Sequence, residues 1–429
     1  MKFILRNKLK FLLAFVAFIQ LSVNILGQII VLKQIGAGDI SDAYIAAQSV
    51  PSVIASILIV AFQSVWLPAF VSISESRKEW LKLQGNAQLF LLIPSVAITI
   101  VLCVTQKLWI SLLFPGFNIN QLTLTAIMAP LFFIASALSC HSALYITALR
   151  SVNKYIVAEL LPLLTTILFL VGMYFLIPIY GIIIAAYLAL LRALVLTLSL
   201  HFLAGNPAYN FSVLTNRNQL IKQLTLICTG SSLFKTSPLV DRYWSSHSPS
   251  GGLTIYNLSQ TAMGTLSSMF DRAICVPNAS LVSKAVANKD FAKVKSLYRY
   301  SLTEITLISV LIEIVIYFLY PVYVYLLTHW LGMTNGLATD MWLLCLLLIG
   351  YLQASAAGSI IVSAFYAMGD MKTPMKIGFL GFIVSILLKT VLFLLYGLKG
   401  MAIATSLYYM MNALVMFLLL ERKVNARLS

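Results

Sequence analysis

Charged residues are scarce in this chain of 429 residues. Asp, Glu, Lys and Arg together make up only 10% of it, whereas an ordinary soluble domain carries about 25%. A soluble protein needs a polar exterior, and so few charged residues cannot supply one. The scarcity excludes a soluble globular enzyme, a disordered chain and a fibrous protein. Because hydrophobic residues reach 60%, the composition predicts an all-α, polytopic membrane protein.

Residues that bind metals or form disulfides are also few. The 5 cysteines lie inside or beside apolar runs without C-x-x-C spacing, so we expect neither a disulfide framework nor a metal site. The 4 histidines are scattered along the chain. No Walker motif is present, and no nucleophile and base can be assigned. We therefore expect a protein without cofactors that is not an enzyme.

Long apolar runs dominate the rest of the chain. About twelve of them approach the ~20 residues that a membrane-spanning helix needs. The seventh and eighth runs are the least apolar. The first run follows the basic segment 1–10 and is too long for a cleaved signal, so we expect it to be an uncleaved helix. The runs centre near Ile19, Ile57, Ala97, Phe133, Ile167, Leu190, Cys228, Met269, Val310, Leu348, Val384 and Met410.

Basic residues between the runs predict the orientation. With the N-terminus in the cytoplasm, 21 of the 29 lysines and arginines fall on the cytoplasmic side and 4 on the outer side. Short cytoplasmic loops of membrane proteins carry such an excess. We expect a protein of the bacterial cytoplasmic (inner) membrane with both termini in the cytoplasm. The net charge of +16 then needs no nucleic-acid partner.

A weak internal repeat divides the chain into halves. When the sequence is shifted by 219 positions, Ala148 meets Ala367 and Gly181 meets Gly400. Six helices per half give the halves the same orientation, and such halves usually enclose a central cavity. The repeat predicts an N-lobe at 1–205 with helices 1–6, a cytoplasmic linker at 206–218, and a C-lobe at 219–429 with helices 7–12.

Several ionisable residues fall within or at the edges of these runs, where an ionised group costs at least ~2.5–3.5 kcal/mol without a partner or a wet cavity. Arg272 and Glu313 have equal predicted depth on adjacent helices, which fits either a structural ion pair or a pair of cavity charges. Asp271 would point about 100° away from Arg272. Lys389 lies in the middle of helix 11 and requires a structural partner or a role in substrate or coupling chemistry. The full set is Arg192, Lys235, Arg272, Lys389, Asp42, Glu159, Asp241, Asp271, Glu304 and Glu313.

Five segments of the chain resemble the MurJ/MviN family. The segment 36–44, Gly-Ala-Gly-x-x-Ser-Asp-Ala-Tyr, and Leu-Pro-Ala-Phe at 67–70 are similar to its helix 1–2 signature. Val-Asp-Arg-Tyr at 240–243 is similar to the end of its helix 7. The segment 363–377 resembles its helix 10–11 turn, and 400–407 resembles the opening of its helix 12. The resemblance extends over nearly the whole chain.

The resemblance implies the MOP exporter fold, in which two six-helix lobes surround a central cavity. It also implies flipping of undecaprenyl-diphosphate-linked saccharides, with lipid II or a related glycan as the substrate. Family members carry several cavity arginines on helices 1, 2 and 8, whereas helix 1 here has only Lys33. Some relatives bind sodium between helices 7, 11 and 12. The counterparts of that cation site here would be Asp241, Ser385, Lys389 and Thr405.

On this reading the chain is an inner-membrane flippase that works by alternating access. Its partners are the lipid-linked glycan and membrane lipids, and we expect a monomer. Asp42 is either a helix-start carboxylate or a gating residue, and Asp271 and Glu313 would take part in gating or ion pairing. The substrate-binding candidates are Arg272, Arg242 and Lys235 for the diphosphate, and Asn24, Gln48, Gln63, Asn257 and Gln260 for sugar hydroxyls.

Two other functions remain open from the sequence. An ion-coupled exporter of drugs or small molecules in the same superfamily would need a titratable carboxylate deep in the N-lobe, for which Asp42 and Glu159 are the candidates. A membrane polysaccharide polymerase or ligase would need a sizeable outer loop with catalytic Arg and His. The short outer loops make that function the least favoured of the three.

Overall fold

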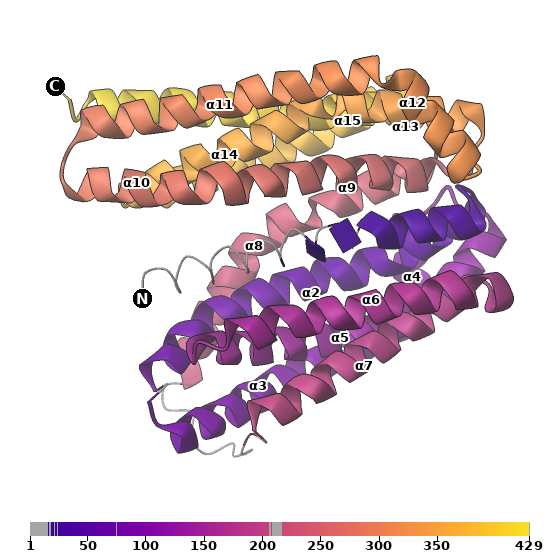
Figure 1. Cartoon of the computed structure of the whole chain (residues 1–429), viewed down its shortest axis with the longest axis horizontal. Coiled ribbons are helices and arrows are strands. Elements are labelled where there is room, and N and C mark those ends of the chain that lie inside the picture. The colour runs from indigo at the N-terminus through magenta and orange to yellow at the C-terminus, as the bar shows by residue number, and fades with distance from the viewer. Residues whose placement is uncertain are drawn as a thin grey trace. The chain divides into compact units, whose positions relative to one another are not determined.

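The computed structural model describes residues 25–73, 75–205 and 217–428, together with residues 16, 19, 20, 22, 23 and 207. All regular secondary structure in this part of the chain is helical. By their contacts the helices form two units, Met1–His247 and Ser248–Ser429 (Figure 1). The first contains a helix at Ile25–Ile35, α2 (Asp39–Ser72), α3 (Arg77–Val104), α4 (Gln106–Leu113), α5 (Ile119–Ser151), α6 (Tyr155–Tyr180), α7 (Ile183–Ala204) and α8 (Arg217–Ser245). The second contains α9 (Gly252–Phe270), the π-helical turn η2 (Asp271–Cys275), α10 (Val276–Ala287), α11 (Phe291–Phe318), α12 (Tyr320–Tyr325), η3 (Leu326–Trp330), α13 (Asn335–Leu347), α14 (Ile349–Ala367) and α15 (Lys372–Asn425).

Eight helices of the described residues are long and apolar enough to cross a membrane. One of them, α15, has 54 residues and contains a kink at Gly397, where φ is 59° and ψ is −140°. That positive φ favours glycine, and it separates two apolar stretches that the sequence places in different spans. Eleven of the twelve predicted centres lie in helical residues, and the other, Leu348, is the turn between α13 and α14. The prediction of an all-α polytopic membrane protein is confirmed.

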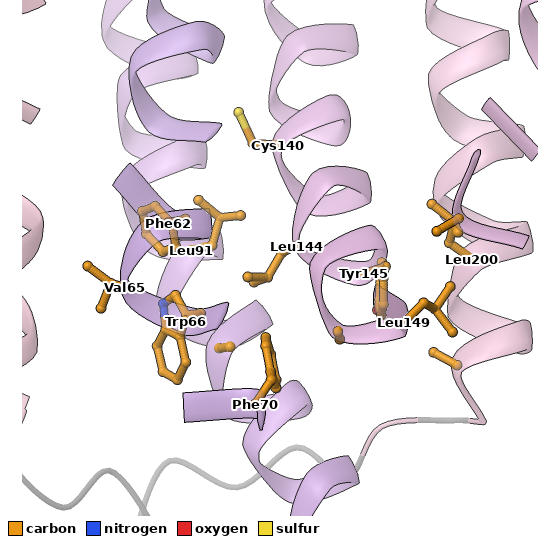
Figure 2. Close-up of a cluster of buried hydrophobic side chains, with 14 of the residues drawn as sticks. Phe62, Val65, Trp66, Phe70, Leu91, Cys140, Leu144, Tyr145, Leu149 and Leu200 are labelled. Atoms are coloured by element: carbon orange, nitrogen blue, oxygen red, sulfur yellow. The ribbon is translucent and has the colours of Figure 1, made fainter. Parts of the chain in front are cut away.

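In the first unit, α5 packs against α2, α3, α6 and α7. Figure 2 shows the buried cluster that joins α2 and α3 to α5 and α7. Three of its most deeply buried aromatic side chains are Trp66 and Phe70 from α2 and Trp80 from α3, which are 1%, 0% and 2% exposed. The Trp80 indole donates a hydrogen bond to Ser151 Oγ at 3.1 Å. Large aromatic side chains thus hold the predicted cytoplasmic ends of α3 and α5 together.

At the other end of the first unit, a carboxylate ties α2 to α5. The α5 helix begins with a capping box, in which Asn118 Oδ1 accepts from Gln121 N and Gln121 Oε1 accepts from Asn118 N, both at 2.9 Å. The two side-chain amides also donate to the Asp39 carboxylate, at 2.8 and 3.0 Å. Asp39 lies in the first turn of α2, where the helix dipole favours a negative charge.

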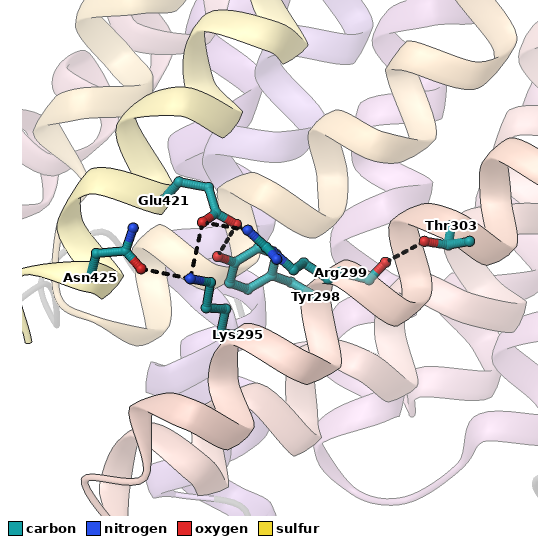
Figure 3. A network of polar contacts seen from close by, with 6 residues as sticks. All are labelled: Lys295, Tyr298, Arg299, Thr303, Glu421 and Asn425. Atoms are coloured by element: carbon teal, nitrogen blue, oxygen red, sulfur yellow. Dashed lines mark hydrogen bonds and ion pairs between the residues drawn. The ribbon is translucent and has the colours of Figure 1, made fainter. Parts of the chain in front are cut away.

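In the second unit, α14 packs against α9, α10, α11 and α15. A polar network joins α11 to the end of α15 (Figure 3). Arg299 binds the Glu421 carboxylate through Nε and a terminal nitrogen at 2.7 and 2.9 Å, and the Tyr298 hydroxyl donates to the same carboxylate at 2.7 Å. Lys295 contacts both Glu421 and Asn425. Because Arg299 is exposed, this network orients the helix ends more than it stabilises them.

The contact units and the predicted lobes have different boundaries. The contacts assign α8 to the first unit, where it packs against α2 and α4. The predicted boundary at 206–218 comes from the sequence repeat, and most of that linker lies outside the described residues. The division into six-helix lobes at 1–205 and 219–429 therefore stays a prediction.

Candidate functional site

Three predicted site residues lie on α2, where one is buried and two are half-buried. Asp42 is 3% exposed and stands in the first turn of α2, where its backbone N–H donates to Gly38 O at 2.9 Å. Gln48 and Gln63 are half-buried further along the helix. The Gln48 amide donates to Tyr44 O of its own helix at 3.4 Å. Asn24 lies outside the described residues.

The three predicted residues of α8 differ in exposure. Lys235 is exposed and Arg242 is half-buried. Asp241 is 2% exposed, and both Asp241 and Arg242 interact with other residues of the protein. Asp241 therefore does not behave as a solvated carboxylate at a helix end.

Two ionisable residues in the spans of the first unit have well-defined partners. Arg150 on α5 pairs with Glu159 on α6, with 2.5 Å between a guanidinium nitrogen and Oε1. Arg192 on α7 donates to Thr166 Oγ1 at 3.2 Å and lies 5.7 Å from the centre of the Phe169 ring. A cation over an aromatic face is stabilised by the ring's electrons. Glu159 and Arg192 thus have structural roles.

The expected ion pair between Arg272 and Glu313 does not form. Both side chains are exposed, and no ion pair or hydrogen bond joins either of them to another described residue. The expectation assumed a regular α-helix from Arg272 to its inner end. Instead Asp271 and Arg272 open the π-helical turn η2, which changes the helical register below them. Asp271 is half-buried and lies beside the Cys275 thiol.

The second unit contains a fully buried lysine. Lys389 and Ser385, one turn apart on α15, are each 1% exposed. Thr405, beyond the kink at Gly397, is also 1% exposed and lies 3.1 Å from the hydroxyl of Tyr256 on α9. Lys389 interacts with another part of the protein, as a buried cation requires. Three of the four predicted cation-site counterparts are thus buried in this unit.

Polar residues of α9 are buried as well. Asn257 is 9% exposed and follows Tyr256, which is fully buried, while Gln260 is half-buried one turn later. The neighbouring Ser259 is fully buried and donates to Ile255 O at 2.8 Å. A polar helix with this degree of burial at membrane depth is costly unless its side chains are hydrogen-bonded or face a wet site.

Sequence reasoning missed a polar network in the first unit. His141 on α5 contacts Gln88 and Ser95 on α3, and all three lie within predicted spans. The signal was the pair Gln84 and Gln88, one helical turn apart in an apolar run, which are 0% and 4% exposed. In the described part of the chain, no three His, Cys, Asp or Glu side chains are close enough to hold a metal ion.

Buried cations, amides and hydroxyls inside apolar helix bundles are typical of proteins that move polar solutes through a membrane. A family model described as lipid II flippase MurJ matches residues 31–428. Comparison with curated protein sequences finds no match.

Solved structures show the same fold. The chain resembles the lipid II flippase MurJ in an inward closed conformation, with a TM-score of 0.81 at 17% identity over 96% of this chain and 87% of that chain. It resembles an inward-facing multidrug resistance MATE family transporter of the MOP superfamily, with a TM-score of 0.77 at 17% identity over 95% of both chains. A MOP superfamily transporter from Pyrococcus furiosus gives 0.66 at 16% identity over 97% of this chain and 95% of that chain.

These findings confirm the resemblance noted in the sequence. The all-α fold is shared with MurJ and with MATE family transporters, and eight of the described helices are long and apolar enough for a multi-pass membrane protein. The match over residues 31–428 shows that this chain, a flippase for lipid-linked precursors, belongs to the MurJ family of lipid II flippases.

Proposed function

We propose that this flippase moves an undecaprenyl-diphosphate-linked saccharide, lipid II or a related envelope glycan precursor, from the inner to the outer leaflet of the bacterial cytoplasmic membrane. The match of the MurJ family model to nearly the whole chain carries the proposal. Both termini would face the cytoplasm, since 21 of the 29 basic residues then fall on that side. Alternating access would expose the headgroup-binding residues first to one side and then to the other.

The headgroup is the part of the substrate that is hardest to move through the membrane. A diphosphate with sugar hydroxyls loses its hydration in hydrocarbon, and that loss is prohibitive unless polar protein groups replace the water. Arg272 is suited to this role, because its guanidinium is exposed and makes no ion pair with a described residue. Arg242 and Lys235 would assist with the diphosphate. Asn24, Gln48, Gln63, Asn257 and Gln260 would bind sugar hydroxyls.

Membrane potential is a sufficient driving force for the step. Moving a negative charge outward across a membrane with an inside-negative potential of ~100 mV is favourable by ~2.3 kcal/mol. Asp42 would act as a gating residue at the start of α2, with Asp271 and Glu313 gating on the second unit. Lys389 would supply a tethered cation, so transport would not need sodium. Asp241, Ser385, Lys389 and Thr405 are the positional counterparts of the residues at which some relatives bind sodium.

A drug exporter of the same superfamily is less well supported. It would need a titratable carboxylate deep in the first unit, and the Glu159 carboxylate is instead paired with Arg150 close to the turn between α5 and α6. Vesicle acidification or alkalinisation stimulated by a drug, and not by a lipid-linked saccharide, would favour the exporter. Formation of a new glycosidic bond by the purified protein would favour a polymerase or ligase.

The experiment measures flipping of a fluorescent undecaprenyl-diphosphate saccharide in proteoliposomes. We expect Arg272→Ala to lower the rate by at least about tenfold, the scale of a lost charged hydrogen bond. Arg272→Lys should retain part of the rate. Lys284→Ala is the matched control, because Lys284 is an exposed cation on α10 and has no proposed contact with substrate. Equal rates for Arg272→Ala and Lys284→Ala, at equal protein levels, would contradict the role of Arg272.

A further inference from the structure

A histidine ring lies between α5 and α3 inside the first unit, with both nitrogens in polar contact. His141 Nδ1 is 2.6 Å from Gln88 Oε1, and Nε2 is 3.3 Å from Ser95 Oγ. Gln88 and Ser95 are only 4% and 3% exposed. Histidine is the side chain whose ordinary pKa falls nearest to neutral pH. The protein thus keeps a titratable ring at membrane depth, in a setting built by two α3 residues.

The hydrogen bonds fix which ring nitrogen carries a proton. Gln88 Nε2 donates to the backbone carbonyl of His141 at 3.2 Å, so Gln88 Oε1 is the amide atom that faces the ring. A carbonyl oxygen can only accept. Nδ1 therefore carries a hydrogen in either charge state, and Nε2 is the site where a further proton binds.

Ser95 has one hydroxyl hydrogen and two acceptors within reach. Its Oγ lies 3.0 Å from Leu92 O and 3.3 Å from His141 Nε2. When the ring is neutral, the hydroxyl donates to Nε2. When Nε2 is protonated, the ring donates to Oγ and the hydroxyl donates to Leu92 O. Every polar group is hydrogen-bonded in both states, so neither state has an orphaned buried donor or acceptor.

The alternative acceptor of the Ser95 hydroxyl is Leu92 O, two residues before Pro94 in α3. Pro94 has no N–H, so the helix lacks a donor to the carbonyl of Phe90 at this point. A serine that bonds back to a carbonyl in its own helix bends the helix further. Phe90 and Pro94 also line a groove of about 480 Å³ between α2, α3 and α8. A change in the Ser95 hydrogen bond therefore acts where α3 meets two neighbouring helices.

The ring has no charged neighbour. Tyr145, one turn along α5, is 2.9 Å from His201 Nδ1 on α7 and not bonded to His141. Within the described residues, His141 bonds to Gln88 and Ser95 alone. The other ionisable groups on α5 and on the helices packed against it make no ion pair or hydrogen bond with the ring. These groups are Asp39, Asp42, Tyr44, Arg77, Lys78, Glu79, Lys82, Cys103, Lys107, Cys140, Arg150, Tyr155, Glu159, Tyr174, Tyr180, Tyr187 and Arg192.

We propose that His141 is a proton-binding site, and that protonation at Nε2 moves the Ser95 hydroxyl from the ring to Leu92 O and so changes the bend of α3 at Pro94. A hydronium ion transfers one proton to the Nε2 lone pair and leaves as water, so that one O–H bond breaks as the N–H bond forms. This inference rests on the proposed function, to which it adds the proton as a coupled or regulating ion. His141 binds the proton, and Ser95 is a positioning residue.

Histidine-labelled protein in lipid vesicles tests the binding step without any substrate. Nitrogen-15 NMR distinguishes a neutral ring protonated at Nδ1 from an imidazolium, and the His141 signal is identified by its loss in His141→Gln. We expect this signal to change from the first form to the second as the pH is lowered from 9 to 3. A ring that keeps one form over that whole range would overturn the proposal.

Flipping rates over the same pH range test the coupling. We expect the wild-type rate to change on the order of fivefold or more across the titration, the lower end of typical coupling between sites. His141→Gln and Ser95→Ala should give flat profiles, and Ser95→Ala should still show a titrating His141 signal. Ser142→Ala is the control, because this buried α5 serine bonds to Thr197 instead.

The two proposals fail in distinguishable ways. A wild-type pH profile in Ser95→Ala would overturn the coupling through α3, even if His141→Gln does not fold. Absence of flipping at every pH, together with a titrating His141, would contradict the proposed function and leave the proton site standing. Loss of the pH profile in Ser142→Ala as well would mean that any buried polar change has this effect, and would also overturn the coupling.

Discussion

His141 Nδ1 and Gln88 Oε1 lie 2.6 Å apart in a part of the first unit from which water is nearly excluded. The same two residues make a second hydrogen bond between α3 and α5, which Gln88 Nε2 donates to His141 O at 3.2 Å. One glutamine thus satisfies a ring nitrogen and a backbone carbonyl. Removing it would leave the ring N–H without its acceptor and would take away the second hydrogen bond to the carbonyl.

Replacing Gln88 by leucine should therefore destabilise the protein. Leucine is similar in size, but it leaves the His141 Nδ1–H unsatisfied, at about 1–3 kcal/mol for a buried polar group. We expect a lower midpoint of thermal unfolding in detergent, measured by tryptophan fluorescence. Ser142→Ala is the matched control on the same helix. A midpoint for Gln88→Leu equal to that of Ser142→Ala would show that the contact contributes little.

Arg272 and Glu313 should act independently. Since neither residue is paired with the other in the structure, the effects of Arg272→Ala and Glu313→Gln on flipping should add in the double variant to within about 0.5 kcal/mol. The measurement is a double-mutant cycle on the flipping rate in proteoliposomes. A coupling well above that value would mean that the ion pair expected from the sequence forms during transport.

Flipping should be independent of sodium. The Lys389 ammonium is buried in the second unit, beside the buried Ser385 on the same helix, and provides a fixed positive charge. We expect equal rates in sodium and in N-methylglucamine at the same ionic strength and membrane potential. Lys389→Ala should then acquire stimulation by sodium, whereas Lys399→Ala, which removes a partly exposed lysine paired with Asp340, should not. Sodium stimulation of the wild type would contradict the tethered-cation role.

Asp370 should stabilise the turn between α14 and α15 except in acid. Hydrogen bonds from Lys423, and from the Thr373 backbone and hydroxyl, hold the pKa of this carboxyl well below its usual range. A lowered folded-state pKa means that the stabilisation is complete above the unfolded value of ~3.9 and is lost as the pH falls through the folded value.

Asp370→Asn should therefore lower the free energy of unfolding at pH 7 by about 0.5–1 kcal/mol, a range that allows for solvent screening of a partly exposed pair. The difference from wild type should shrink below pH 4, because the wild-type carboxylate then loses its advantage. Denaturant unfolding at several pH values measures both quantities. A difference that grows in acid would show that the sign of the pKa shift is wrong.

The sequence predicted the helices well because a helix that spans the membrane must consist largely of apolar residues. Each apolar run is long enough to bury in hydrocarbon, so its position follows from residue types alone. Local backbone geometry was less accessible. The π-helical turn at Asp271–Cys275 has no clear sequence signal, and it removed the equal-depth pairing of Arg272 with Glu313. The prediction assumed a regular α-helix at this point, whereas the π-helical turn contains one extra residue.

The polar network around His141 shows a different limit. The spacing of Gln84 and Gln88 placed two amides on one face of a helix in an apolar run, which indicates an interior polar feature. Their partner is on α5, more than 50 residues further along the chain, as the separation of 53 between Gln88 and His141 shows. Only the packing of α3 against α5 identifies it. The roles of the buried Lys389 and Asp241 depend in the same way on tertiary structure.

The central claim is that this chain carries a diphosphate-linked saccharide headgroup through the membrane. The most direct measurement uses purified wild-type protein in vesicles with a fluorescent lipid II analogue on the inner leaflet and, in parallel, fluorescent phosphatidylglycerol. We predict that the protein speeds transfer of the lipid II analogue to the outer leaflet, more so with a positive potential outside, and leaves phosphatidylglycerol at the rate of protein-free vesicles. Folded protein that leaves the lipid II analogue at that same rate, or moves both lipids equally, would contradict the account.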